Sequence, residues 1–199
     1  MTLTESLKSR ERSLKLKLAR LLKKGDIILV SEKGIFNSIC RVVQRTKWHH
    51  IMLYAGRGRV LEVTPREGCR LTFLNHCISK YKALQVLRHK KISSMQARRM
   101  IGTAIKLFKS RPFSRLQVLK IALLRELNLF KHALNLIVKR NRLRVRHLNM
   151  KDVICSNMVA MSYHLFGYRI NESYSPDYVV PRDYANSREL QVVCSVVLA

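Results

Sequence analysis

The chain has 199 residues, 47% of them hydrophobic and few of them glycine or proline, so a packed domain is expected rather than a disordered tail. Lysine and arginine number 39 against 12 acidic residues, which gives a formal net charge of +27. A protein this basic is attracted to polyanions such as nucleic acid, anionic lipid headgroups or acidic cell-wall polymers. The charge gives the sign of a partner and leaves its identity open.

The cysteine and hydropathy patterns exclude several protein classes. The five cysteines are an odd number and form no CxxC pair; they are Cys40, Cys69, Cys77, Cys155 and Cys194. We therefore expect no disulfide framework, no cysteine-based zinc site, no cofactor, and a reduced compartment. The polar, charged N-terminus does not resemble a secretory signal peptide, and no apolar run reaches the roughly 18 residues of a membrane-spanning helix. The expected location is cytoplasmic, with peripheral membrane attachment or export by a non-Sec route left open.

The predicted elements alternate in type and favour an α+β domain. Helical periodicity is present at residues 1–24, 35–45, 94–109, 115–140 and 152–167. Apolar or alternating runs predict strands at residues 26–31, 50–55, 59–64, 69–73, 83–88 and 190–198. The turn at residues 56–58, Gly-Arg-Gly, is typical of a hairpin. An antiparallel meander of about four to six strands follows from this spacing.

A histidine and a carboxylate are placed to meet across this hairpin. Alternation along the first strand assigns Ile51 and Leu53 to the core and His50 to the other face, while the competing His49 points away from it. Pairing around the turn is expected to set His50 roughly opposite Glu62. A carboxylate there can hold the imidazole tautomer and stabilise its charged form.

Cys155 has the context of an activated thiol. It lies in the first turn of a predicted helix opened by Asp152 as N-cap and closed by Gly167. The positive end of a helix dipole lowers a thiol pKa. The free backbone amides of the first turn, that of Cys155 included, can form an oxyanion hole. A lone cysteine in an apolar helix is usually a core residue, so the combination with His50 and Glu62 is what favours catalysis.

Five segments in order carry a resemblance to a known family: Gly25–Val30, Trp48–Tyr54, Val60–Pro65 with Gly68–Arg70, Ile154–Ala160 and Pro181–Ser187. Over roughly residues 25–190 they resemble the circularly permuted papain-like cysteine hydrolases of the NlpC superfamily, in particular the YiiX-like branch. The resemblance implies a permuted papain-like fold in which an antiparallel sheet or barrel packs against helices. It also implies the catalytic order His50, Glu62, Cys155. Trp48, Tyr54 and Ser156, within these segments, are candidate substrate-binding residues.

Two features depart from the family pattern. Phe113 stands where many relatives have a tyrosine before the nucleophile, with Ser110 near the position of their glycine. The basic helical stretch 115–147 looks like an insertion. The expected organisation is therefore a basic N-terminal helix, residues 1–24, and one catalytic domain, residues 25–199.

Two functions from different classes follow. In the first, Cys155 attacks an amide, ester or thioester carbonyl and His50 moves the proton, as in a cysteine hydrolase or acyltransferase. Its substrate is a cell-wall peptide, a lipid or acyl group, or a protein. In the second, the basic helices make a membrane- or nucleic-acid-associating module on a papain-like scaffold without catalysis. No nucleic-acid-binding signature appears and aromatic residues are 7% of the chain, so an anionic membrane is the stronger polyanionic partner.

Overall fold

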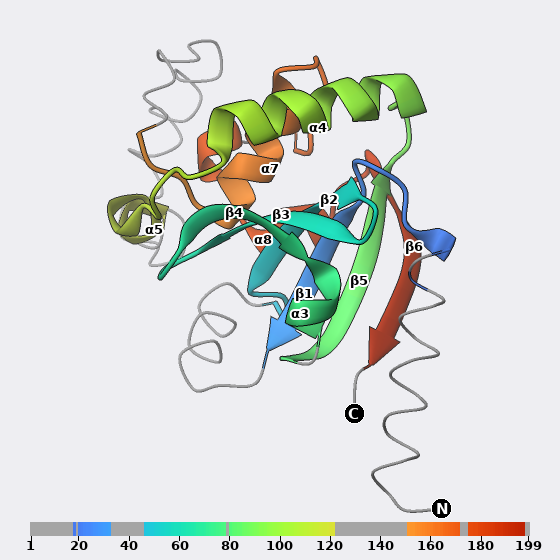
Figure 1. Ribbon diagram of the computed structural model, residues 1–199, viewed down its shortest axis with the longest axis horizontal. Helices are drawn as coiled ribbons and strands as arrows, with labels where there is room; N and C mark the ends of the chain where they lie inside the picture. The colour runs from blue at the N-terminus through green and yellow to red at the C-terminus, as the bar shows by residue number, and fades with distance from the viewer. Residues whose placement is uncertain are drawn as a thin grey trace, which may run out of the picture.

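The computed structural model describes residue 18 and residues 20–32, 46–78, 80–121, 151–171 and 175–197. Within them one six-stranded sheet forms, in the order β4-β3-β2-β1-β5-β6 with every neighbouring pair antiparallel (Figure 1). The strands are β1 (Ile27–Glu32), β2 (His50–Gly56), β3 (Arg59–Thr64), β4 (Gly68–Phe73), β5 (Tyr81–His89) and β6 (Leu190–Val197). The first four strands form a meander, and β5 returns to the free side of β1.

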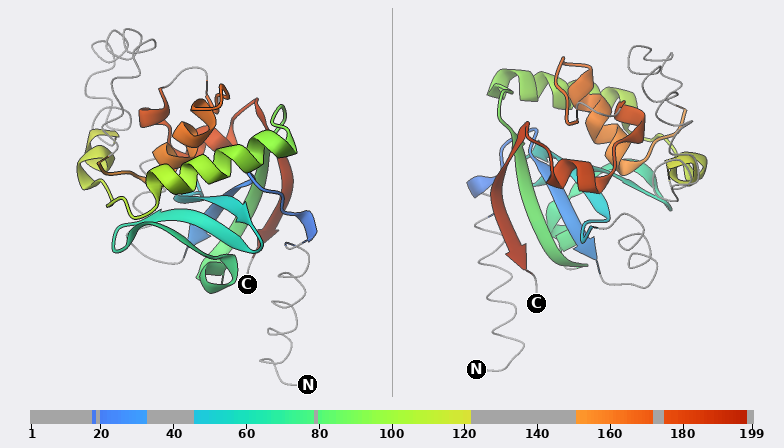
Figure 2. Two further views of the ribbon diagram at one scale, coloured as in Figure 1. Left: turned by 45° about the horizontal axis from the view of Figure 1, so that its top comes forward. Right: turned by 180° about the vertical axis from the view of Figure 1, so that it is seen from behind.

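Helices cover both faces of the sheet (Figures 1 and 2). The helices are α3 (Leu74–Ile78), α4 (Ser94–Phe108), α5 (Arg115–Ile121), α7 (Cys155–His164) and α8 (Pro181–Ala185), with a 3-10 turn, η2, at Pro176–Tyr178. One core lies between the sheet and α4, α7 and α8. A second core lies on the opposite face, where Leu18, Leu22 and α3 cover the strands. No helix in the described part of the chain is long and apolar enough to cross a bilayer.

The two cores explain the composition of β2. Ile51 and Leu53 belong to the core under α7, as their alternation predicts, and Met52 and Tyr54 belong to the second core. Both sets of side chains are buried because the sheet has no solvent face at this strand. His50 is the first residue of β2 and is only partly buried.

The sequence predicts most of the described elements well. The α+β class and the antiparallel meander are confirmed, and β5 is longer than the predicted residues 83–88. Helix α4 begins after Ser93, whose side chain accepts from the Gln96 amide in a capping box. The predicted hairpin turn after β2 is confirmed, and Gly56 and Gly58 adopt left-handed backbone conformations in it.

The predicted start of the helix that carries Cys155 is wrong. The sequence indicated a helix from residue 152 with Asp152 as N-cap, but α7 begins at Cys155 with Ile154 as N-cap. Val153 and Ile154 are extended instead, and Val153 pairs with Phe113 in an isolated bridge. Residues 1–17, 35–45 and 122–150, which include most of the predicted basic helices, lie outside the described residues.

Candidate active site

Three of the predicted residues come together where the first turn of α7 meets the start of β2. Cys155 is the first residue of α7, His50 is the first residue of β2, and Glu62 lies within β3. Helix α7 packs directly on β2 and β3. The β2–β3 hairpin and α7 are separate elements. The packing of α7 on the sheet brings Cys155 next to the pair of His50 and Glu62.

His50 reaches Glu62 diagonally across the hairpin. Its Nε2 lies 3.4 Å from Oε2 of Glu62. The residue directly opposite Glu62 is Met52, so the predicted pairing of His50 with Glu62 is two positions out. A two-residue turn, Arg57-Gly58, and an irregularity in the pairing between Tyr54 and Gly56 set this register. Diagonal neighbours in a sheet are about 7–8 Å apart at Cα, a gap that a histidine and a glutamate together can span.

Cys155 and His50 form a coupled acid–base pair. Burial opposes ionisation of Cys155, but the charge of His50, a hydrogen bond with it, and the amides of Ile51 and Ser156 together lower the thiol pKa. Burial likewise opposes the charge of His50, and the charges and hydrogen bonds of Cys155 and Glu62 raise the imidazole pKa. Both pKa shifts arise from the attraction and the hydrogen bond between Cys155 and His50. They favour a thiolate beside an imidazolium.

Glu62 is a buried carboxylate that stays ionised. Its side chain is only 2% exposed. Burial alone would raise its pKa, yet hydrogen bonds and charge from His50 and Arg70 lower it to about 2. Arg70 lies directly opposite Glu62 in the β3–β4 register and contacts its Oε1 through Nη2 at 2.8 Å. Arg70 is not among the site residues predicted from the sequence, although extending the strand register by one hairpin would have found it.

The first turn of α7 is anchored from several sides. The backbone amide of Ile154 donates to Oδ1 of Asn157, and the side-chain amide of Asn157 donates to Asp177 in η2. The Tyr184 hydroxyl donates to the carbonyl of Ser156. Asn157, Asp177 and Tyr184 were also missed, because nothing in the sequence brings η2 and α8 next to Cys155.

The candidate substrate-binding residues are all buried. Trp48 packs in the core under α7, and Ser156 is 2% exposed on the inner side of that helix. Tyr54 lies in the second core, where its hydroxyl accepts from the Gly58 amide of the hairpin turn. Their role in binding a substrate stays a prediction. Phe113 packs against Ile154 and Val180, next to the first turn of α7.

The other described cysteines have environments unlike that of Cys155. Burial, aided by the charge of Glu62, raises the pKa of Cys69 to about 12 and that of Cys77 to about 11. Burial also raises the pKa of Cys194. In the described part of the chain, therefore, the thiol with a lowered pKa is the one beside His50. No group of three or more histidine, cysteine or acidic side chains is arranged to hold a metal among these same residues.

Comparison with known proteins identifies a fold. No protein-family model and no curated protein matches the chain. Among solved structures it is similar to the crystal structure of the metalloprotein yiiX from Escherichia coli O157:H7, also described as DUF1105, with a TM-score of 0.62. The sequences are 13% identical, and the match covers 88% of this chain and 98% of that one. The chain has a YiiX-like fold.

Proposed function

We propose that this protein is a cysteine hydrolase or acyltransferase that acts on an amide, ester or thioester through Cys155, His50 and Glu62. The observation that carries the proposal is the placement of Cys155, the first residue of α7, in hydrogen-bonding contact with His50, whose Nε2 faces Glu62. A partly buried thiol with a lowered pKa beside a base is what covalent catalysis at neutral pH requires. The permuted papain-like relationship belongs to this proposal, and the YiiX-like fold is compatible with it.

In the proposed acylation, the Cys155 thiolate attacks the carbonyl carbon and the C–S bond forms as the carbonyl π electrons move to oxygen. The first-turn amides of α7, that of Cys155 included, stabilise the resulting oxyanion. As the oxyanion collapses, the bond to the leaving group breaks and the His50 imidazolium gives its proton to that group. The products of this half-reaction are a neutral His50, a thioester on Cys155 and the released amine, alcohol or thiol.

Deacylation uses the same residues in the reverse roles. Neutral His50 accepts a proton from water or from an acceptor amine, which then attacks the thioester carbonyl. The C–S bond breaks, and Cys155 leaves as a thiolate beside the re-formed imidazolium. Water gives a hydrolase and an amine gives an acyltransferase. Glu62, held against Nε2 of His50, orients the ring and stabilises its charged form in both halves.

A metal ion, which the name metalloprotein implies for yiiX, does not fit the residues of this site. Both oxygens of Glu62, the acidic member of the group, already have partners, Oε1 in Arg70 and Oε2 in His50, and a cation would have to displace one of them. The described residues also offer no cluster of three or more metal-ligating side chains. The proposed steps therefore use the chain's own residues.

The test is trapping of the acyl-enzyme by mass spectrometry after incubation with acyl-ester lipids and with muropeptides. The proposal expects a mass increase on the Cys155 peptide that is absent in Cys155→Ala and strongly reduced in His50→Ala. Cys194→Ala, which removes a half-buried thiol away from the site, is the matched control and should keep the adduct. An adduct that survives in Cys155→Ala would overturn the assignment.

A second candidate, a basic binding module without catalysis, is favoured by charge alone. Besides the net charge of +27, the outer face of α4 carries four exposed cations, Arg98, Arg99, Lys106 and Lys109 at its end. This candidate predicts binding to a polyanion that weakens steeply with salt and is unchanged in Cys155→Ser. Loss of function in Cys155→Ser with unchanged binding would decide for the enzyme.

A further inference from the structure

Glu62 can stabilise the charged form of His50 only while the Glu62 carboxylate is ionised. The burial of Glu62 opposes this ionisation. A carboxylate as buried as Glu62 tends to take up a proton, since burial in a low-dielectric environment penalises the charged form. His50 contacts it at 3.4 Å, a long distance for a charge-assisted hydrogen bond. A second cation is therefore needed to keep the carboxylate charged, and the structure provides one.

The two oxygens of Glu62 have separate partners. Oε1 accepts from Nε of Arg70 at 2.9 Å and lies 2.8 Å from Nη2 of the same guanidinium. The thiol of Cys77 also donates to Oε1, at 3.7 Å. Oε2 faces Nε2 of His50. Because Arg70 engages Oε1 with two nitrogens, rotation of the carboxylate is restricted and Oε2 stays directed at the imidazole.

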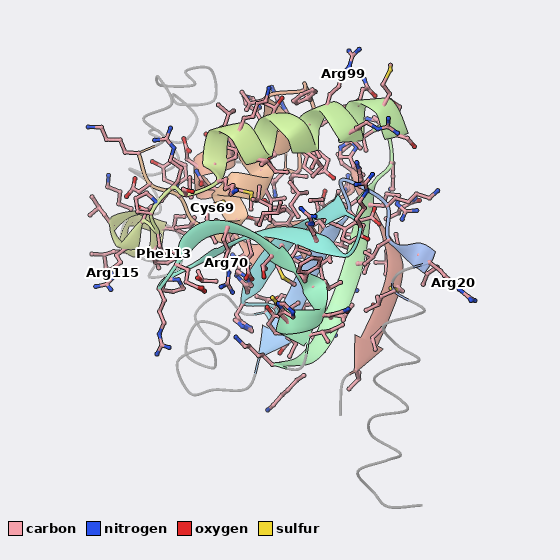
Figure 3. All side chains as sticks on the ribbon, viewed as in Figure 1. Arg20, Cys69, Arg70, Arg99, Phe113 and Arg115 are labelled. Carbon is pink, nitrogen blue, oxygen red and sulfur yellow. The ribbon has the colours of Figure 1, made fainter. Side chains whose placement is uncertain are left out.

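Arg70 is itself held in place. It lies directly opposite Glu62 on β4, and its Nη1 forms an ion pair with Glu67, the residue just before that strand. Neighbouring side chains on β4 point to opposite faces, so Cys69 joins the core under α7 while Arg70 turns to the other face (Figure 3). The backbone amide of Cys69 donates to the carbonyl of Arg111, and its carbonyl accepts from the amide of Ser110. These two hydrogen bonds fix the position of the strand that carries Arg70.

We propose that Arg70 is a positioning residue of the active site, which holds Glu62 ionised and aimed at His50. The inference rests on the proposed function and adds a fourth member to it. Four charges then alternate in sign along one path: Arg70 positive, Glu62 negative, His50 positive and Cys155 negative. The Arg70–Glu62 pair is neutral as a unit, so His50 can lose and regain its proton without leaving an uncompensated buried carboxylate.

Removal of Arg70 has a defined electrostatic consequence. Without the guanidinium the pKa of Glu62 rises, and the carboxylate takes up a proton at a higher pH than in the wild type. A protonated Glu62 no longer stabilises the imidazolium, so the pKa of His50 falls and that of Cys155 rises. The rate of thiolate alkylation rises with pH as Cys155 ionises, and we call this rising part of the profile the acid limb. The acid limb therefore moves to higher pH.

The experiment measures the rate of Cys155 alkylation by iodoacetamide against pH in the full chain, with Arg70→Met, Arg70→Lys and Arg59→Met. Arg59 is the matched control, because it lies exposed on β3 over Phe73 and does not contact Glu62. We expect Arg70→Met to move the acid limb up by about one pH unit, the lower end of the shift that one nearby opposite charge causes. Arg70→Lys should move it less, and Arg59→Met should leave it in place.

Circular dichroism at each pH confirms that each variant is folded, and Arg70→Gln replaces Arg70→Met if the latter does not fold. A loss of packing alone lowers the melting temperature without moving the limb. An unmoved limb in folded Arg70→Met overturns the proposal. His50→Ala in the same series separates this result from failure of the proposed function. If His50→Ala moves the limb and Arg70→Met does not, only the role of Arg70 is wrong, whereas an unmoved limb in His50→Ala refutes the catalytic pair itself.

Discussion

The hydroxyl of Tyr184 donates a hydrogen bond to the backbone carbonyl of Ser156, the residue that follows Cys155. Tyr184 is fully buried on α8, 28 residues further along the chain. The bond ties the first turn of α7 to the C-terminal part of the domain, so the position of the thiol depends on an element that lies far from it in sequence.

Tyr184→Phe should lower the free energy of unfolding by about 1 kcal/mol, the usual net value of one buried hydrogen bond. The carbonyl of Ser156 keeps its helical surroundings, so a larger loss is not expected. Urea denaturation followed by circular dichroism measures the change. Tyr54→Phe is the comparison, because its partner, the Gly58 amide, lies in an exposed turn and can bond to water instead. An equal or larger loss in Tyr54→Phe would contradict this account.

Alkylation of Cys155 should persist well below pH 8.5, the ordinary pKa of a free thiol. The lowered pKa of Cys155 depends chiefly on the charge of His50. His50→Ala should therefore move the acid limb up by more than about one unit, toward the ordinary thiol value. Peptide mapping of a short iodoacetamide pulse at pH 6 measures this, with Cys69 and Cys77 as internal references. Those thiols should stay unlabelled in the folded protein, and labelling of either at the rate of Cys155 would refute the prediction.

Glu62→Gln should destabilise the protein by about 2–3 kcal/mol at pH 7, because the amide keeps one acceptor oxygen but removes the negative charge that Arg70 and His50 share. The folded pKa of Glu62 is lowered to about 2 from an ordinary value near 4.5. A lowered carboxyl pKa stabilises the fold fully above the unfolded value and loses that effect as pH falls through the folded one.

The difference in unfolding free energy between wild type and Glu62→Gln should therefore shrink as the pH falls from about 4.5 to about 2. Urea titrations at pH 7, 5, 4 and 3 measure it. Glu67→Gln, at the exposed partner of Arg70, is the control and should change stability by less than about 1 kcal/mol. A difference that grows toward low pH would have the wrong sign.

Gly68→Ala should destabilise the protein by about 3 kcal/mol, as the sum of backbone strain and overpacking. Gly68 has a φ of +65°, and a Cβ there would lie 2.3 Å from the carbonyl oxygen of Arg111. Gly58→Ala is a matched control, since its φ is +69° but nothing lies within 4 Å of its Cβ. The control should lose only about 1 kcal/mol, from strain alone. Thermal or urea unfolding compares the two, and equal losses would show that the contact with Arg111 does not matter.

Much of the local structure could be predicted because it depends on neighbouring residues. Alternation identifies the strands, the turn glycines Gly56 and Gly58 fix the β2–β3 hairpin, and a Ser–Gln capping box marks the start of α4. The hairpin turn also fixes which residues of β2 and β3 share a face, so His50 and Glu62 could be paired to within two positions. These features follow from backbone geometry over a few residues.

Only the tertiary structure decided what surrounds the thiol. Cys155 is one of five cysteines in the sequence, and its lowered pKa arises because α7 packs against the first residue of β2. Asn157, Asp177 and Tyr184 join the site through contacts between segments far apart in the chain, which no local pattern encodes. Electrostatic shifts depend on distances and burial in three dimensions, whereas strands, turns and caps depend on adjacent residues. The sequence alone therefore determined the elements and the candidate pair, and the fold decided which charges hold that pair together.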